Sequence, residues 1–460
     1  MVKMYLVRKA HNNSNITTQR NRAFTKGNKM SVSSQTSIPL SKGDPEKVPV
    51  ATEAIPAKSQ DDIEFPEGGL QAWLVAIGNA CILFCTSGYS NTFGVFQAYY
   101  TLHQFSDKSA DAVSWIGSTQ VFLGLFAAIL GGPLFDRYGA WVIRPTAVVY
   151  LFAIMMTSLC TQYWQFMLAQ GILHGTASGI LMFSAMASTP QYFRKRRGVA
   201  MGLAMTGSSI GAIIYPIVLS KLLNDSSLGF GWSVRITGFI MVPALLFASA
   251  TVKARLPPRR TSFLLPAAFT DKLYVTLVAS MFFLFIGMFV PLFYLPTYGI
   301  LHGMTETLAS YLIAMINGAS VFGRVIPGIM GDKVGQLNAL LFAGASTGVM
   351  IFCWPAATTQ SGIIGFAVVF GFCSGAIISG GAVAMTLCPK DVRDMGTYIG
   401  MGTGLASFAA LMGPPVNGAL LDRYGGFEQV SIFSGVMCMT GALLVLLAKA
   451  FTSQGMLGKV

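Results

Sequence analysis

The sequence predicts an all-α membrane protein with twelve transmembrane helices in two six-helix repeats. Hydrophobic residues make up 53% of the 460 residues and charged residues only 11%, whereas a soluble domain has about 25% charged residues. Apolar segments of about 20 residues, long enough to span the hydrocarbon core, recur after residue 65. A polar loop motif and a glycine–proline pattern also occur in both halves of the chain.

Residues 1–65 are polar, rich in Ser, Asn, Thr and Lys, and show no hydrophobic period. A segment with so few apolar residues cannot bury enough surface to fold, so we expect a disordered cytoplasmic tail. Met1 and Met30 are alternative starts of the chain.

Twelve apolar segments follow, each long enough to cross a membrane. They are expected near 72–99, 113–134, 141–160, 164–189, 198–220, 232–252, 273–298, 308–330, 337–356, 361–386, 396–420 and 429–449. We expect the first six to form an N-terminal bundle over 66–252 and the last six a C-terminal bundle over 273–450. A short cytoplasmic linker, 253–272, joins the bundles, and 451–460 form a cytoplasmic C-terminal tail.

The cations of the loops predict the orientation. Fourteen loop lysines and arginines fall on one side of the predicted membrane and four on the other. Because cytoplasmic loops are enriched in Lys and Arg, both termini are predicted to be cytoplasmic. The net charge of +13 then reflects topology, not a nucleic-acid-binding surface. The plasma membrane is the expected location, with a vacuolar or other organelle membrane as the alternative.

A loop motif of the form G-x-[LM]-x-D-[RK]-x-G occurs twice, at 132–139 after the second segment and at 328–335 after the eighth. Residues of the fifth segment recur in the eleventh: Gly198, Gly202 and Pro216 match Gly396, Gly400 and Pro414. Parallel repeats with a binding site at their interface are typical of secondary transporters.

The loop motif predicts a contact between helix ends that changes with conformation. Gly139 permits a tight turn, and Asp136 can then face the positive N-terminal end of an adjacent helix, expected to be the eleventh segment. Arg137 is expected to bridge nearby carboxylates or lipid phosphate. Asp332 and Lys333 are the equivalent residues of the second copy. We expect these residues to act in conformational gating; the alternative is a plain turn with solvated charges.

The loop motif resembles the signature that the major facilitator superfamily carries between its second and third helices. The stretch from Glu67 to Trp73 is similar to the acidic–Gly–Gly–aromatic signature of monocarboxylate-transporter-like proteins, with the tryptophan at the spacing of the fungal branch. The stretch from Tyr192 through Gly207 is similar to the fifth-helix signature of that branch. The resemblance covers residue 67 to about residue 450. It implies the major facilitator fold and transport of a small, monocarboxylate-like organic anion by alternating access, without a cofactor; we expect a monomer.

Two positions depart from the animal carriers of that branch. The resemblance places their helix-one lysine at Asn91 and their helix-eight aspartate at Ser320, while their helix-eight arginine is matched by Arg324. No Asp or Glu lies deep inside any predicted segment, so the resemblance does not establish proton coupling.

Five polar residues at membrane depth are candidates for substrate binding. Arg324 can fork onto a substrate carboxylate, or it can be a structural arginine that binds backbone carbonyls. His174 is a candidate for substrate or proton binding, with a packing role as the alternative. Asn91 and Asn317 either line a cavity or tie helices together. Tyr294 is a pocket or gate candidate, although aromatic residues at helix ends often belong to an interfacial belt.

Three classes of function remain. Transport of a small organic anion is the main prediction, and efflux of a secondary metabolite is the alternative. A non-transporting sensor on a transporter scaffold is the second alternative. An enzyme is not expected, because the segments contain no acid–base or metal-binding constellation and thus no catalytic or metal-ligating residues. The sequence has no Walker A motif, so we do not expect ATP to drive transport.

Overall fold

The structure, a computed structural model, describes residues 65–105, 108, 110–224, 226–259, 262–452, 455 and 458–459. The predicted N-terminal tail therefore lies outside the described residues except for Phe65, as does half of the predicted C-terminal tail, 451–460. Within the described ranges, all regular secondary structure is helical.

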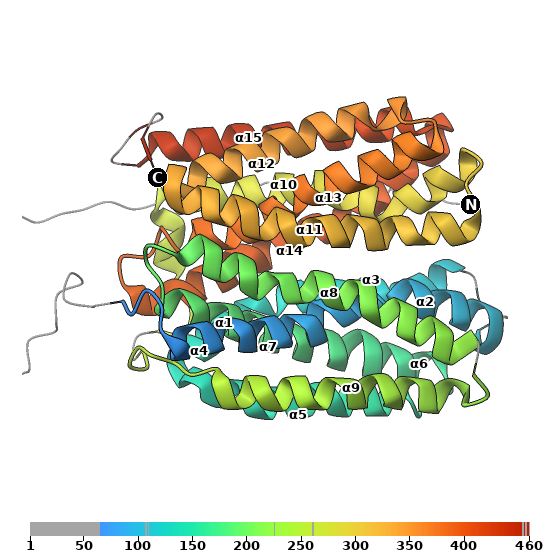
Figure 1. The fold of residues 1–460 in the computed structure, drawn as a ribbon, viewed down its shortest axis with the longest axis horizontal. Helices are drawn as coiled ribbons and strands as arrows, with labels where there is room; N and C mark the ends of the chain where they lie inside the picture. The colour runs from blue at the N-terminus through green and yellow to red at the C-terminus, as the bar shows by residue number, and fades with distance from the viewer. Residues whose placement is uncertain are drawn as a thin grey trace, which may run out of the picture. The chain divides into compact units, whose positions relative to one another are not determined.

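The helices follow one another along the chain with short connections (Figure 1). The first nine are α1 (Leu70–Leu83), α2 (Phe93–Tyr99), α3 (Ala110–Phe126), α4 (Ala128–Tyr138), α5 (Ile143–Thr157), α6 (Tyr163–Phe166), α7 (Gly175–Ser188), α8 (Arg197–Asn224) and α9 (Gly229–Thr251). The remaining six are α10 (Lys272–Leu301), α11 (Glu306–Val334), α12 (Gln336–Cys353), α13 (Gln360–Met385), α14 (Met395–Tyr424) and α15 (Phe427–Ala450). We refer to α1–α9 as the N-terminal half and to α10–α15 as the C-terminal half.

Eleven helical stretches in the described residues are long and apolar enough to cross a membrane. One of them, Ala112–Thr157, contains 46 residues and would be about 69 Å long as a helix, more than twice the hydrocarbon thickness. It is two crossings, because α4 ends at Gly139, whose φ of 63° is left-handed and favours glycine. The predicted fold class of twelve membrane helices is therefore confirmed.

Two predicted crossings contain segments of π-helix. The first crossing passes from α1 into η2 (Phe84–Gly88), turns at Asn91 and Thr92, and continues as α2. The fourth crossing contains η5 (Met167–His174) between α6 and α7. The sequence predicts helices here but not these interruptions, because an apolar segment of membrane length has the same composition in either helix type.

The two ends of the helices differ in charge, and exposed aromatic residues mark both. We call the end that carries Arg137, Arg194–Arg197 and Lys333 the basic end. At this end Trp141 is 76% exposed and lies beneath the guanidinium of Arg144. Other exposed aromatic residues lie at the opposite end: Trp164, Trp232 and Tyr424. Exposed apolar side chains lie between the two ends, among them Val148, Phe152, Leu246, Phe342 and Leu443. This distribution is typical of interfacial aromatic belts around a lipid-facing surface.

Two apolar cores are present, and one of them extends across both halves. One core is built from side chains of the N-terminal half. The other is centred on the C-terminal half but includes six residues of the first half: Leu83, Ala128, Phe183, Met186, Met201 and Met205. The two halves therefore bury apolar side chains against each other.

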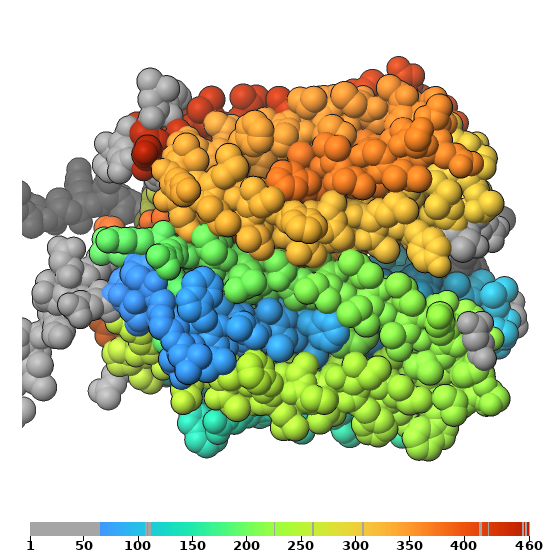
Figure 2. Space-filling model, viewed as in Figure 1, coloured from blue at the N-terminus to red at the C-terminus, as the bar shows by residue number. Residues whose placement is uncertain are grey.

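The halves meet chiefly along two helix pairs, α4 with α14 and α8 with α11; α14 also packs on α3 and α7, and α8 on α13. Figure 1 shows α8 and α11 diverging toward the end that carries α2 and α6. In Figure 2 the side chains of α8 (green) lie along those of α11 (yellow to orange) over much of their length. We call these two contacts the α4–α14 seam and the α8–α11 seam.

Close packing of α8 on α1 generates a prediction about stability. A Cβ on Gly207 would clash with the backbone carbonyl of Ala80, so we expect Gly207→Ala to destabilise the protein by about 1–3 kcal/mol. Thermal unfolding of the purified protein measures this as a lower midpoint. The control is Gly365→Ala, since a Cβ there would meet no atom within 4 Å. Equal midpoints for the two variants would contradict this account of the packing.

Candidate functional site

The α4–α14 seam is formed by small residues at the basic end. A Cβ on Gly132 would clash with the carbonyl of Gly396, and one on Gly400 with the carbonyl of Ala128. Residues four apart share one face of a helix, and this spacing continues along α14 through Gly404 to Phe408. The seam therefore brings backbones into direct contact near the basic end.

Aromatic side chains replace the glycines farther along this seam. The ring of Phe408 lies 5.5 Å from that of Phe122 and 5.9 Å from that of Phe126. Bulky rings separate the helices more than glycines do. The backbones of α3 and α14 therefore cannot approach as closely here as those of α4 and α14 do near the basic end.

The α8–α11 seam repeats this arrangement with different side chains. A Cβ on Gly198 would lie 2.5 Å from the carbonyl oxygen of Gly328, and one on Gly202 would clash with the carbonyl of Arg324. Farther along, the hydroxyls of Ser209 and Ser320 lie 2.7 Å apart and share a hydrogen bond. The halves are thus closed against each other at the basic end along both seams.

Asp136 lies at the N-terminus of α14, the helix that the sequence predicts as its neighbour. The carboxylate is buried, and its Oδ2 accepts hydrogen bonds from the backbone N–H of Thr397 at 2.6 Å and from its hydroxyl at 2.7 Å. A carboxylate in this position satisfies an unpaired donor and interacts favourably with the helix dipole. Asp136 belongs to α4, so this contact joins the two halves.

Asp332 makes the corresponding contact at the N-terminus of α8. Its Oδ1 accepts from the N–H of Gly198 at 2.8 Å and its Oδ2 from the N–H of Val199 at 3.0 Å. The side-chain amide of Gln336 donates to the same carboxylate at 2.5 Å. The two copies of the loop motif therefore place one carboxylate from each half on a helix start of the other half.

The other gating candidates occupy the surface beside these contacts. Gly139 ends α4 with a left-handed backbone. Arg137 is exposed, and its guanidinium lies 5.9 Å from the ring centroid of Tyr138. Among the described residues this ring contact is present and a bridge from Arg137 to a carboxylate is not. Contact with lipid phosphate, the other expectation, stays a prediction. Lys333 is also exposed, so the contacts across the seams come from the aspartates.

The two signatures of the monocarboxylate-transporter-like resemblance contact each other. The carboxylate of Glu67 accepts hydrogen bonds from three successive backbone N–H groups, those of residues 194–196, at 3.0, 2.7 and 3.3 Å. The rings of Trp73 and Phe193 lie 5.1 Å apart. Glu67 therefore holds the basic stretch that leads into α8.

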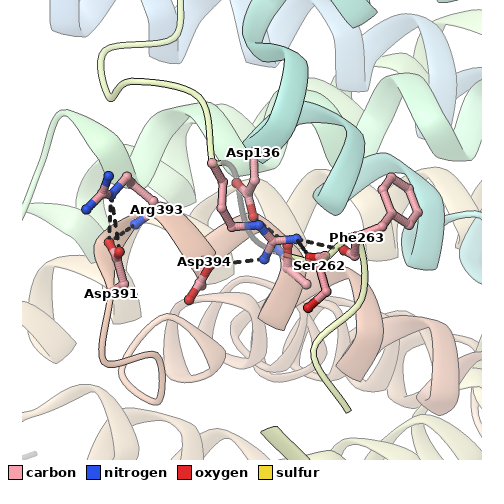
Figure 3. A network of polar contacts seen from close by, with 8 residues as sticks. Asp136, Ser262, Phe263, Asp391, Arg393 and Asp394 are labelled. Atoms are coloured by element: carbon pink, nitrogen blue, oxygen red, sulfur yellow. Dashed lines mark hydrogen bonds and ion pairs between the residues drawn. The ribbon is translucent and has the colours of Figure 1, made fainter. Parts of the chain in front are cut away.

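Two buried arginines at the basic end have partners that the sequence does not predict. Arg197 of α8 donates from Nη1 to the hydroxyl of Thr386 at 2.9 Å, across the boundary between the halves. Arg259, in the stretch that joins the halves, forms an ion pair with Asp394 at 3.0 Å (Figure 3). Both arginines look like ordinary loop cations in the sequence, and only the fold brings their partners close.

Arg324 lies in the α8–α11 seam, and its side chain contacts α8. Its Nη1 donates to the carbonyl of Met205 and to the hydroxyl of Ser208. The residue is 5% exposed, and its Nε has no hydrogen-bond partner among the described residues. Among the described residues, the guanidinium therefore donates hydrogen bonds from Nη1 only, and its Nε donates none.

The structure does not bring the other substrate-binding candidates into contact with Arg324. Asn91 is exposed and donates to the carbonyl of Ser87 at 2.8 Å, within its own crossing. Asn317 is buried and donates to the carbonyl of Ile313 at 2.9 Å. The ring of Tyr294 lies 6.5 Å from that of Phe427, inside the C-terminal half. Their binding roles stay predictions.

His174 lies in the interior of the N-terminal half. It is 1% exposed, and its ring packs 5.5 Å from Tyr89 and 4.9 Å from Tyr150. Neither ring nitrogen has a hydrogen-bond partner among the described residues. Both aromatic neighbours belong to the core of the N-terminal half, so this position favours the packing alternative over substrate binding.

Twelve membrane crossings in two halves that meet along the α4–α14 and α8–α11 seams are typical of a membrane transporter. Residues 75–403 match the family model of the Major Facilitator Superfamily, and the chain belongs to that family.

Several similar proteins carry efflux in their names. The chain is 49% identical to the aspyridones efflux protein of Emericella nidulans over 87% of this chain and 82% of that protein. It is 37% identical to the agnestins efflux protein of Paecilomyces divaricatus, over 85% of this chain and 90% of that protein. It is 35% identical to the fujikurins efflux protein of Gibberella fujikuroi, over 85% and 84%.

Solved structures share the fold at low sequence identity. The Escherichia coli fucose–proton symporter FucP superposes with a TM-score of 0.64 at 14% identity, over 82% of this chain and 99% of that chain. The human organic anion transporter MFSD10 gives a TM-score of 0.61 at 14% identity, over 82% and 97%.

The position of Asp136 generates a prediction about transport. Asp136→Asn keeps an acceptor for Thr397 but removes the negative charge at the start of α14, an interaction of about 0.3–2 kcal/mol. We expect the variant to fold and insert normally while transport in reconstituted vesicles falls sharply, because the closed basic end is less stable. Thr397→Ser, which retains both donors, is the matched control. Normal transport by Asp136→Asn would contradict the gating role.

Proposed function

We propose that this protein exports a secondary metabolite by alternating access and that Arg324 binds an acidic group of the substrate. The observation that carries the proposal is the 49% identity to an aspyridones efflux protein over 87% of this chain. The agnestins and fujikurins efflux proteins support the same class of substrate. Export of a metabolite is thus better supported than transport of a small monocarboxylate.

The closed basic end fits the release step of an exporter. Loop cations predict that this end faces the cytoplasm. Both seams are closed there by backbone contacts at Gly132, Gly198 and Gly202. In an alternating-access cycle a state closed at this end follows substrate entry from the cytoplasm, and substrate enters only after the seams have separated at the basic end.

The hydrogen bonding of Arg324 supports an anionic substrate. A guanidinium binds a carboxylate best through two parallel N–H groups, and Nε with Nη2 forms one such edge. In this structure Nη1 donates to Met205 and Ser208, and Nε has no partner in the part of the chain that the structure describes. This edge is buried in the closed state, so substrate reaches it only after the surrounding helices move.

A small monocarboxylate is the second candidate substrate. The contacts of Glu67 with the basic stretch, and of Trp73 with Phe193, support membership of the monocarboxylate-transporter-like branch. Membership of the monocarboxylate-transporter-like branch does not by itself decide between a small monocarboxylate and a larger metabolite. We propose in addition a monomer in the plasma membrane, surrounded by lipid, with both termini cytoplasmic.

Export can be tested by expressing the full chain in yeast loaded with an aspyridone, the compound class named for the 49%-identical relative. We expect cells with the transporter to retain less compound than cells with Asp136→Asn at equal expression. Lactate, tested in the same way, represents the second candidate. Movement of lactate alone would overturn the metabolite proposal, and movement of neither compound nor of a wider metabolite panel would favour the sensor alternative.

Arg324 generates a second functional prediction. We expect Arg324→Lys, which keeps the charge and loses the fork, to weaken substrate binding. Arg324→Ala should reduce binding by about 10- to 100-fold, since hydrogen bonds to a charged group contribute about 1.5–3 kcal/mol. Ser208→Ala, which removes only a partner of Nη1, is the control and should bind nearly as well as the wild type. Full affinity in a folded Arg324→Ala protein would refute an anion site, and failure to fold would favour the structural arginine.

A further inference from the structure

Arg259 lies in the stretch between α9 and α10, yet it is as buried as a core residue. It is 5% exposed, although neighbouring positions such as Pro257 and Pro258 are exposed. Burying a guanidinium is costly unless partners replace its water. The partners of Arg259 therefore show what this residue holds together.

One side of Arg259 is bonded to the N-terminal half. Its backbone N–H donates to the carbonyl of Asp136 at 2.8 Å. Asp136 is the residue whose carboxylate accepts from Thr397 at the start of α14. The main chain of Arg259 is thus fixed to the end of α4.

The other side of Arg259 is bonded to the C-terminal half. Its Nη1 lies 3.0 Å from Oδ1 of Asp394, the residue that directly precedes α14. Its Nη2 donates to the carbonyls of Ser262 and Phe263 at 2.8 and 2.7 Å, which folds the linker around the guanidinium. Figure 3 shows Asp136, Asp394, Ser262 and Phe263 close together, with dashed lines marking these bonds. A single residue therefore joins α4 to the start of α14.

We propose that Arg259 is a positioning residue for transport: a strap on the inter-half linker that stabilises the closed basic end through Asp136 and Asp394. α4 and α14 separate when the α4–α14 seam opens, so at least one of the two bonded sides of Arg259 must release. The strap rests on the proposed alternating-access cycle. The proposal gives the linker between the halves a role in the cycle. The sequence predicts this linker only as a short connection rich in basic residues.

A neighbouring ion pair serves as a matched control. Arg393, which directly precedes Asp394 at the same end of α14, contacts Asp391 at 3.1 Å. Its side chains are 39% and 42% exposed, compared with 3% and 21% for Arg259 and Asp394. An exposed pair within one loop stabilises little and joins no two helices of different halves. Arg393→Gln should therefore not affect the seam.

The test uses a cysteine buried in the α4–α14 seam as a reporter of opening. Ala128 is fully buried against the C-terminal half. The full chain carries Ala128→Cys and has the exposed Cys353 replaced by serine; the same chain without Ala128→Cys gives the baseline. The initial rate at which a water-soluble maleimide labels the purified protein then measures how often the seam opens.

We expect Arg259→Gln and Asp394→Asn each to raise the labelling rate about tenfold, because each breaks the ion pair and leaves its remaining charge, half-buried Asp394 or buried Arg259, without that partner. Combining them should raise the rate no more than the stronger single change, because both remove one interaction. Arg393→Gln should label at the parent rate. If Arg259→Gln folds poorly, Arg259→Lys retains the charge but loses the bonds from Nη2, and we expect a smaller increase.

Two results would overturn the strap. Labelling of Arg259→Gln, or of Arg259→Lys in its place, at the rate of Arg393→Gln would show that the residue does not control the seam. If the double variant is labelled at a rate that multiplies the increases of Arg259→Gln and Asp394→Asn, the two residues do not act as a pair. Asp136→Asn distinguishes failure of the strap from failure of the alternating-access proposal. If Asp136→Asn is labelled faster and Arg259→Gln is not, the seam opens as proposed and only the role of Arg259 is refuted. If no variant is labelled, the seam does not open and the proposed cycle fails with it.

Discussion

The closed state of this protein depends on carboxylates that occupy the starts of helices in the opposite half. Asp136 accepts two hydrogen bonds at the N-terminus of α14, and Asp332 accepts two at the N-terminus of α8. Each helix start has unpaired N–H groups and a partial positive charge, which water or the partner half must satisfy. The glycines of both seams make this possible, because they let a helix end come close enough for the side chain to reach.

The repeat relates the two seams, but their side chains differ. The α4–α14 seam continues from glycines into the rings of Phe122, Phe126 and Phe408. The α8–α11 seam continues into hydroxyls and a guanidinium, those of Ser209, Ser320 and Arg324. One seam thus offers an apolar surface at mid-depth and the other a polar, positively charged one. A substrate between them would meet different chemistry on its two sides.

The sequence predicts the fold and the position of Asp136 because both depend on local patterns. Hydrophobic length and the repeated loop motif indicate the crossings, and the motif itself carries the glycine turn and the carboxylate. The sequence does not predict the contacts of Arg259, because this residue belongs to no repeated motif and its own neighbourhood resembles any basic loop. His174 was considered a site candidate because it is polar and mid-membrane. A polar residue in a membrane helix can face the interior of its own six-helix half or face the other half, and the amino-acid composition does not distinguish these two orientations.

The π-helical segments give the first crossing a property that a continuous α-helix lacks. In η2 the turn is wider than in α1, and the same crossing breaks at Asn91 before α2 begins. Successive residues of an α-helix are about 100° apart around its axis. A π-turn contains about one residue more than an α-turn, so the side chains that follow it are rotated around the axis by about one residue. The side chains beyond η2, where Gly88 packs against Gly211 of α8, therefore face a different direction from the one that a continuous α-helix would give them.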